Sequence, residues 1–273
     1  MDISEMASRI GTAQVPEEER VRQAKVLRKW QADQFNKQEG KLHYADGFSC
    51  PSCKNRGLIA EYFEEFELPN IRYHLCDCDR VRKAIQRLKN SGLENVTQKY
   101  RFDNFNATEG WQRTMLEAAK GYMEDPKAWF YIGGQPGCGK THICSAMAVE
   151  YIRRGMPVLY SVWNAEINGL RSKQGEEGYA ERLEELSCIP VLYLDDLFKH
   201  GGGADPTSYE LTVAFHILNK RYLSGLPTII SSELPLQKLT EIDEAIGSRI
   251  EEMCRGKYNL YIGHADGRNY RQK

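Results

Sequence analysis

The stretch that decides the fold is Gly133-Gly134-Gln135-Pro136-Gly137-Cys138-Gly139-Lys140-Thr141. From Gly134 onward it follows the pattern G-x-x-x-x-G-K-[ST] of a phosphate-binding loop. The apolar residues 128–132 before it predict a buried strand, and residues 142–152 after it predict a helix. In that context the glycines let backbone N–H groups point at phosphate oxygens, and the dipole of the helix N-terminus adds to the attraction. The stretch therefore predicts a nucleotide-binding loop.

Two side chains of this loop have predicted roles of their own. Lys140 is expected to reach the β- and γ-phosphates and to contribute to catalysis, and the Thr141 hydroxyl is expected to ligate Mg²⁺. The predicted cofactors at this site are ATP and Mg²⁺. The residues predicted to bind the nucleotide are Gly134, Gln135, Pro136, Gly137, Cys138, Gly139, Lys140, Thr141, His142 and, from a later strand, Asp195.

An apolar strand predicted at residues 190–194 ends in two acids, Asp195 and Asp196. An acidic strand in this place, two strands after a phosphate-binding loop, is the second half of a nucleoside triphosphatase site. Asp195 is expected to hold Mg²⁺, directly or through water. Asp196 is expected to orient or deprotonate the attacking water. A buried strand with an acidic end is the structural alternative, and the position after the loop favours the catalytic interpretation.

A further strand is predicted at residues 227–233, and its carboxyl end is polar. In folds of this kind that end places a polar side chain between the γ-phosphate and the attacking water. Ser232 is the residue predicted for this role. Ser231 and Glu233 are neighbours that could fill it instead.

Five predicted strands alternate with helices along the second half of the chain. This order favours an α/β fold with a five-stranded parallel sheet that helices cover on both faces. A strand is inserted between the phosphate-binding loop and the acidic strand. That arrangement is typical of the P-loop ATPases with an extra central strand (the ASCE class), which includes the AAA+ proteins.

Four cysteines upstream form two close pairs, with the sequences C-P-S-C and C-D-C. They are Cys50, Cys53, Cys76 and Cys78. Four thiolates in two close pairs suit tetrahedral Zn²⁺. Residues 58–63 and 71–75 predict the two strands of a hairpin that carries these ligands. The zinc is expected to be structural, because a module of this size lacks enough core to fold without a staple. His43 and His74 are alternative ligands, since the second pair is not C-x-x-C.

The composition is that of an ordinary soluble protein, with 273 residues and a formal net charge of −1 at pH 7. This balance argues against bulk nucleic-acid binding but not against a local basic surface. No stretch is apolar and long enough to span a bilayer, and residues 1–5 lack the basic start of a signal peptide. The expected location is the cytoplasm, without a membrane partner. Thiols stay reduced there, so the eight cysteines do not predict disulfides.

Together these motifs resemble those of the DnaC/DnaI-type replicative helicase loaders, which include phage-encoded members. The core carries the phosphate-binding loop and V-L-Y-L-D-D-L at residues 191–197. The strand L-P-T-I-I-S-S-E-L at residues 226–234 is similar to the sensor strand of that family, and I-G-S-R-I-E-E-M at residues 246–253 is similar to its arginine-finger segment. The cysteine pairs, the basic helix after them and Y-R-F-D-N-F at residues 100–105 resemble the zinc-bearing loaders.

The resemblance implies an ATP-dependent loader that places the replicative helicase on single-stranded DNA when replication starts. The N-terminal region would bind the hexameric helicase, and the ATPase domains would self-associate side by side and engage single-stranded DNA. It also implies that Arg249 of one subunit reaches the γ-phosphate bound to the next. Arg221 is a second candidate for this arginine finger. Candidate DNA contacts lie in residues 164–173, which include Arg171 and Lys173.

With this resemblance the chain divides into four predicted segments. Residues 1–44 are a helical extension, and residues 45–92 are a zinc-binding module that interacts with the helicase. Residues 93–110 are a linker, and residues 111–273 are the AAA+ ATPase domain.

Two features depart from many AAA+ proteins. The acidic strand ends in Asp-Asp instead of Asp-Glu, and too few residues follow the last predicted strand, at 258–262, for a full C-terminal helical lid. Both features resemble the loaders. They predict slow hydrolysis that is coupled to assembly, with the nucleotide acting as a conformational switch.

Two other functions compete with the loader. An IstB-like transposition-helper ATPase shares the same core, so the core does not discriminate, but the zinc module favours the loader. The third hypothesis is a zinc-dependent nucleic-acid-binding module with a vestigial ATPase site. The intact phosphate-binding loop and the two acids of the acidic strand speak against it.

Overall fold

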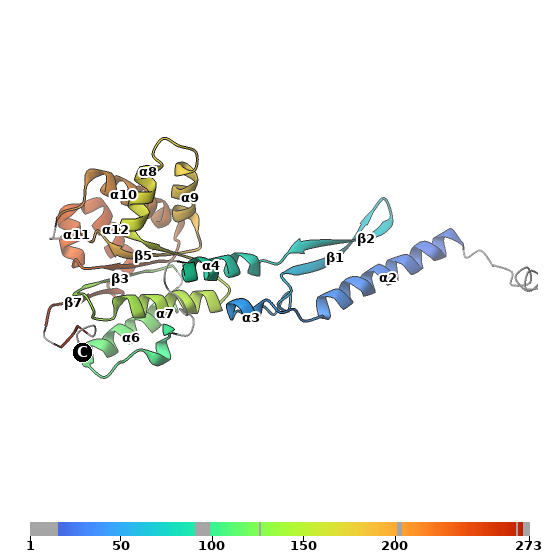
Figure 1. Cartoon of the computed structure of the whole chain (residues 1–273), viewed down its shortest axis with the longest axis horizontal. Helices are drawn as coiled ribbons and strands as arrows, with labels where there is room; N and C mark the ends of the chain where they lie inside the picture. Colours follow the sequence, from blue (N-terminus) through green and yellow to red (C-terminus); the bar gives the residue numbers. More distant parts are fainter. Residues whose placement is uncertain (1–15, 91–98, 126, 201–203, 266, 270–273) are drawn as a thin grey trace, which may run out of the picture. The chain divides into compact units, whose positions relative to one another are not determined.

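The computed structural model describes residues 16–90, 99–125, 127–200, 204–265 and 267–269 (Figure 1). The chain forms two compact units, Met1–Asp79 and Arg80–Lys273. The predicted boundary between residues 92 and 93 lies outside the described residues, as do the first fifteen residues of the predicted N-terminal extension. The four-segment division stays a prediction.

The first unit consists of a long helix, a short helix and a β-hairpin. Helix α2 (Glu17–Lys37) has three acids in its first turn, where they interact favourably with the helix dipole. Helix α3 (His43–Asp46) follows it. Strands β1 (Leu58–Glu65) and β2 (Leu68–Leu75) pair antiparallel, which confirms the predicted hairpin.

Helix α2 packs against this hairpin through polar and aromatic contacts. The Asn36 amide donates to the Ala60 carbonyl at 2.8 Å and accepts from the Ala60 N–H at 2.9 Å. It thereby satisfies backbone groups of β1 as a neighbouring strand would. The Phe35 ring lies 3.6 Å from the Arg56 guanidinium and meets the Tyr73 ring edge to face.

The second unit is an α/β domain. Before its sheet come α4 (Cys78–Asn90), which starts at the last cysteine, η1 (Phe102–Asn104) and α6 (Gly110–Tyr122). The remaining elements are β3 (Trp129–Gly134), α7 (Lys140–Arg153), β4 (Val158–Val162), α8 (Trp163–Ser172), α9 (Tyr179–Cys188), β5 (Val191–Leu197), α10 (Ser208–Ser224), β6 (Thr228–Ser232), α11 (Leu236–Ile242), α12 (Glu244–Cys254) and β7 (Asn259–Ile262).

The sheet has five strands in the order β4-β5-β6-β3-β7, and all neighbours are parallel. This confirms the predicted five-stranded parallel sheet. Along the chain β4 separates the phosphate-binding loop from the acidic strand, but in the sheet β4 lies at the edge and β6 lies between β3 and β5. Its Ile229 is opposite Phe130 of β3 and Tyr193 of β5. Every residue of β3 is buried, which explains its continuous apolar sequence.

Helices cover both faces of this sheet (Figure 1). Helices α6 and α7 pack on one face, where α7 contacts β3, β4, β5 and β6. Helices α8 and α12 pack on the opposite face, and α10 packs between α9 and α12. Among the described residues no helix follows β7, and none of the helices combines the length and apolar character needed to cross a membrane.

Two glycines let the end of β3 approach its neighbours closely. A Cβ atom at Gly133 would lie 2.1 Å from the Leu234 carbonyl oxygen. A Cβ atom at Gly134, whose φ is +146°, would lie 2.4 Å from the Ile262 carbonyl oxygen. Only glycine fits these positions, so both residues hold the start of the phosphate-binding loop against the residues that follow β6 and β7.

Arg221 is a structural residue of this domain. Its side chain is fully buried, and its guanidinium donates to the Thr228 hydroxyl and to main-chain carbonyls that include those of Ile189 at 2.8 Å and Pro227 at 2.6 Å. Burial lowers the pKa of the Arg221 guanidinium. A guanidinium so enclosed does not reach a neighbouring subunit, which removes Arg221 as an alternative arginine finger.

Replacing Arg221 should therefore destabilise the domain. The Arg221→Met variant leaves buried carbonyls without a donor, and we expect it to lower the free energy of unfolding by about 3 kcal/mol. Urea denaturation followed by tryptophan fluorescence measures this loss. The matched control is Lys220→Met, because Lys220 directly precedes Arg221 on α10 and makes an exposed ion pair with Glu184. An equal effect of both substitutions would contradict this role of Arg221.

Candidate functional site

A pocket of about 380 Å³ lies where the phosphate-binding loop meets the carboxyl ends of β5 and β6. Parallel α/β sheets bind their ligands at this edge. The pocket contains charged groups of both signs. Its lining residues are Lys99, Tyr100, Pro136, Gly137, Gly139, Lys140, Thr141, His142, Asp196, Lys199 and Glu233.

The phosphate-binding loop supplies most of one wall. Six of the predicted loop residues line the pocket, whereas Gly134, Gln135 and Cys138 do not. Those three are buried and support the loop. The Gln135 side chain, for example, accepts from the Ala265 N–H at 2.9 Å and ties the loop to the segment after β7. The Lys140 ammonium donates to the carbonyls of Gly134 at 2.7 Å and Gln135 at 3.1 Å.

Asp195 lies behind the pocket and is only 5% exposed. Its carboxylate accepts hydrogen bonds from the Tyr160 hydroxyl at 2.8 Å, from the Tyr193 hydroxyl at 2.9 Å and from the Ser231 hydroxyl. Burial and the charge of Asp195 raise the pKa of both tyrosines, so both phenols remain donors. Among the described residues that line the pocket, Asp195 does not occur. The carboxylate is therefore rigidly held one layer below the pocket surface.

Asp196 lines the pocket, whereas Asp195 does not. Its backbone adopts a left-handed conformation with φ of +56°, and its side chain is 30% exposed. The Asp196 N–H donates to the Ser231 hydroxyl at 3.0 Å, which fixes the turn at the end of β5. An aspartate in the left-handed region is a strained feature of the kind that occurs at functional sites.

Lys199 bridges Asp196 to the end of β6, and the sequence did not single it out. Its Nζ lies 3.0 Å from Asp196 Oδ2 and 2.9 Å from Glu233 Oε1. Burial alone would lower the pKa of Lys199, but the two carboxylates outweigh it and raise the pKa. The sequence feature that could have identified Lys199 is its position three residues after the second acid of the acidic strand, in D-D-L-F-K.

The residues at the end of β6 differ in what they face. Ser232 is fully buried, and its hydroxyl donates to the Leu197 carbonyl at 2.8 Å and accepts from the Leu234 N–H at 3.2 Å. Ser231 is bonded to the acidic strand. Glu233 is the one of the three sensor candidates that lines the pocket.

His142 anchors the segment before the domain to the start of α7. Its ring meets the rings of Tyr100 and Phe105 edge to face, each at 5.3 Å between centroids. Its Nε2 lies 3.3 Å from the Arg101 carbonyl and 3.2 Å from Asn104 Oδ1, so this nitrogen is the donor. Burial lowers the pKa of His142, which favours the neutral ring.

Arg249 lies on α12, away from the pocket of its own chain. Its guanidinium donates to Asn219 Oδ1 at 3.0 Å and to the Ala245 carbonyl at 2.6 Å. It also lies over the rings of Phe215 and Tyr222, at 5.0 and 5.6 Å from their centroids. The side chain is thus half-buried and held in a defined direction.

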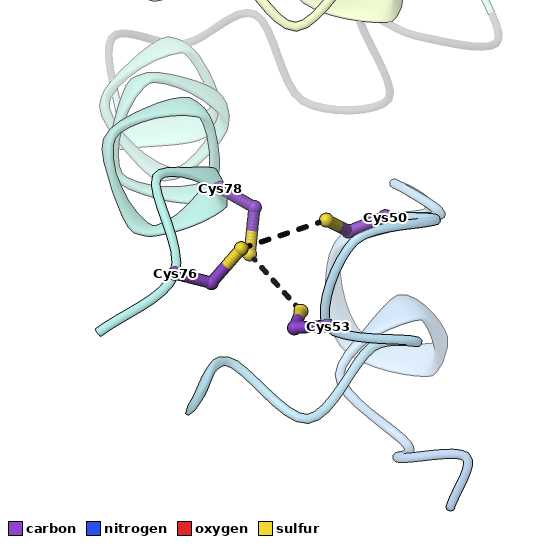
Figure 2. A group of neighbouring side chains, drawn as sticks. All are labelled: Cys50, Cys53, Cys76 and Cys78. Carbon is purple, nitrogen blue, oxygen red and sulfur yellow. Dashed lines mark hydrogen bonds between the residues drawn. The ribbon is translucent and has the colours of Figure 1, made fainter. Parts of the chain in front are cut away.

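The four cysteines gather at one point of the first unit (Figure 2). All four are buried, and their sulfur atoms lie within 4.8 Å of one another. The Cys50 and Cys76 sulfurs are 3.8 Å apart, and those of Cys53 and Cys78 are 3.5 Å apart. Sulfurs that bind one tetrahedral Zn²⁺ at about 2.3 Å must lie about 3.8 Å apart, so the cluster fits this metal. The group contains neither His43 nor His74, the two alternative ligands.

The backbone around the first cysteine pair supports the cluster. The Gly57 N–H donates to Cys53 Sγ at 3.3 Å, and the Asn55 side chain accepts from the Cys50 N–H at 2.7 Å. Burial would raise the pKa of the Cys53 thiol, but the hydrogen bonds from Gly57 and from the other cysteines lower it to about 7. Phe48 packs against the cluster and shields it. Such partners orient metal ligands.

Comparison with known proteins identifies the family. Residues 75–250 match the family described as "IstB-like ATP binding protein". The phage-like element PBSX protein XkdC of Bacillus subtilis is 31% identical over 240 residues, which are 83% of this chain and 87% of XkdC. The replicative helicase loader DnaC of Escherichia coli is 24% identical over 67% of this chain and 74% of its own length.

Solved structures agree on the fold. The crystal structure of the DnaC helicase loader is 19% identical, with a TM-score of 0.51, and covers 61% of this chain and 98% of that chain. The chain spans only about half of the length of the DnaA structures that it also matches. The fold, the phosphate-binding loop and these matches lead to one conclusion: the chain is a member of the IstB-like ATP-binding protein family, with an AAA+ domain homologous to that of the DnaC helicase loaders.

Proposed function

We propose that the chain is an ATP-dependent loader that places a hexameric replicative helicase on single-stranded DNA when replication starts. The observation that carries this proposal is the match to the E. coli replicative helicase loader over 67% of this chain and 74% of that protein. The cysteine cluster and the exposed apolar residues of the first unit support it further.

ATP binding and hydrolysis are proposed for the pocket at the phosphate-binding loop. The backbone of the loop and Lys140 would hold the phosphates. Thr141 and Asp195 would hold Mg²⁺, which neutralises charge on the phosphate oxygens when bound. Three hydroxyl groups already donate hydrogen bonds to the buried Asp195 carboxylate. We therefore expect Asp195 to contact Mg²⁺ through a water molecule. Asp196 faces the pocket and would orient or deprotonate the attacking water.

Arg249 is proposed to complete the site of a neighbouring subunit. It lies outside its own pocket, is partly exposed and is directed by Asn219 and two aromatic rings. A guanidinium supplied by a neighbour would stabilise the charge of the transferred phosphoryl group. Self-association through the ATPase domains would therefore control hydrolysis.

The first unit presents the surface proposed for the helicase. Three apolar residues of α2, Val26, Leu27 and Trp30, are 65%, 52% and 57% exposed. On β2, Tyr73 is 55% and Leu75 64% exposed. Large apolar side chains grouped on one small body mark a protein–protein contact.

Contact with single-stranded DNA is proposed for helix α8. Arg171 at its end lies 5.1 Å from the centroid of the Tyr209 ring, so a cation and an aromatic ring lie together on this surface. Phosphate contacts and base stacking use such groups. Binding of this kind should weaken as the salt concentration rises.

A transposition-helper ATPase is the second candidate. The description of the matched family as IstB-like favours it, because that match covers residues 75–250. The match to DnaC favours the loader. The transposition-helper function would be supported if a transposase stimulated ATP hydrolysis and the chain did not bind a replicative helicase.

A helicase-binding assay with the full-length chain tests the loader proposal. We expect the wild type to bind a hexameric replicative helicase and, with ATP, to deposit it on single-stranded DNA. Trp30→Asp should weaken the complex about tenfold, because it places a charge in the proposed contact. Leu223→Asp is the control, since Leu223 is 73% exposed on α10 of the other unit. No binding by folded, zinc-loaded wild type would refute the proposal.

We also propose that the cysteine cluster holds one structural Zn²⁺. The sulfur distances and the burial of all four thiols support this assignment. Zinc would join the turn at Cys50 and Cys53 to the chain that leaves β2, and so stabilise a unit with little apolar core.

Removal of one ligand tests the zinc site. Purified wild type should contain about one zinc per chain, and Cys76→Ser should lose it and unfold the first unit at a lower temperature. Cys188→Ser is the control, because Cys188 is exposed and outside the cluster. Atomic emission measures the zinc content of each variant, and thermal denaturation measures its unfolding temperature. Equal zinc contents in both variants would contradict the assignment.

A further inference from the structure

We propose that Lys199 is a second phosphate-contacting cation of the nucleotide pocket and makes the site prefer a nucleoside triphosphate over a diphosphate. The inference rests on the proposed binding of ATP in this pocket. It adds a residue that the phosphate-binding loop does not contain.

Lys199 lies in the pocket beside the group proposed to act on the attacking water. Its ammonium lies within 3.0 Å of Asp196 and Glu233, and all three residues line the pocket. Lys140 and Thr141 line the same pocket from the loop. Asp196 is the group that would act on the water attacking the γ-phosphate. A cation paired with Asp196 is therefore on the side of the pocket where the terminal phosphate would lie.

The positive charge of Lys199 offsets two carboxylates in the pocket. Asp196 and Glu233 would repel an incoming phosphate, because all three groups are anionic. Lys199 contacts both carboxylates and offsets this repulsion. A terminal γ-phosphate would offer the ammonium charge-assisted hydrogen bonds that compete with those to the carboxylates. ADP lacks this group, so its affinity would not depend on Lys199.

The Lys199 side chain is free to change partners. The Lys199 side chain is 36% exposed, whereas Lys140 is 6% exposed as a residue and tied to the loop. A lysine ammonium rotates on a four-carbon stem. Lys199 can thus exchange a carboxylate for a phosphate oxygen without a change in the backbone. The other lysine of the pocket, Lys99, instead lies near the Tyr100 ring in the segment that His142 anchors.

The competing interpretation is a structural one, in which Lys199 only ties the end of β5 to the end of β6. The two interpretations differ in what they predict for nucleotide binding. A structural tie would change the affinity for both nucleotides together or for neither. A phosphate contact would change the affinity for the triphosphate alone.

The test measures dissociation constants of ADP and of the non-hydrolysable ATP analogue AMPPCP, both with Mg²⁺, by calorimetry on the full-length protein. We expect Lys199→Met to weaken AMPPCP binding at least about fivefold and ADP binding less than about twofold. Lys238→Met is the matched control, because Lys238 pairs with Glu241 at 3.3 Å on the exposed surface. It should change neither constant.

Equal weakening of both nucleotides, or no weakening of AMPPCP, would overturn the assignment of Lys199. A wild type that binds neither nucleotide would instead refute the proposed function of the pocket. The two failures are therefore distinguishable.

A second variant keeps the test valid if Lys199→Met does not fold. Glu233→Gln leaves Lys199 in place and removes one carboxylate that competes for its ammonium. We expect this variant to bind AMPPCP at least about twofold more tightly and ADP unchanged. Unchanged or weaker binding of AMPPCP would count against the proposal.

Discussion

The parallel pairing of β6 with both β3 and β5 is the constraint on which the rest of the structure depends. It brings the carboxyl ends of three strands to one edge of the sheet, with the phosphate-binding loop after β3, Asp196 in β5 and Glu233 after β6. Ser231 of β6 then bonds both acids of the acidic strand. A slip of β6 by one residue would turn its side chains to the opposite face and break these bonds.

This arrangement separates side chains that are rigidly held from side chains that can exchange ion-pair partners. Asp195 is buried and held by three hydroxyl groups, whereas Asp196 faces the pocket and pairs with Lys199. Of these two acids, Asp196 is the one that lines the pocket. With the arginine that we propose a neighbouring subunit supplies, these exchangeable ion pairs would make the bound nucleotide sensitive to assembly.

Local sequence patterns predicted much of this molecule, and long-range contacts set the rest. The phosphate-binding loop, the five parallel strands and the cysteine pairs follow from spacing and apolar runs that the chain carries within short windows. The burial of Ser232 and Arg221 does not, because it depends on which main-chain carbonyls from other elements surround them. The pairing of Lys199 with Glu233 likewise joins residues 34 positions apart, through the register of β5 and β6. No local pattern records that register.

We propose that the nucleotide lies at a subunit boundary that Arg249 of a neighbour completes. The most direct measurement is ATP hydrolysis, with single-stranded DNA present, by Lys140→Ala protein, by Arg249→Ala protein and by their equimolar mixture. Each variant alone should be inactive, because every site lacks one group. The mixture should recover roughly a quarter of the wild-type rate, since random assembly pairs an intact loop with an intact arginine in that share of boundaries. A mixture no more active than the two separate variants would contradict the claim.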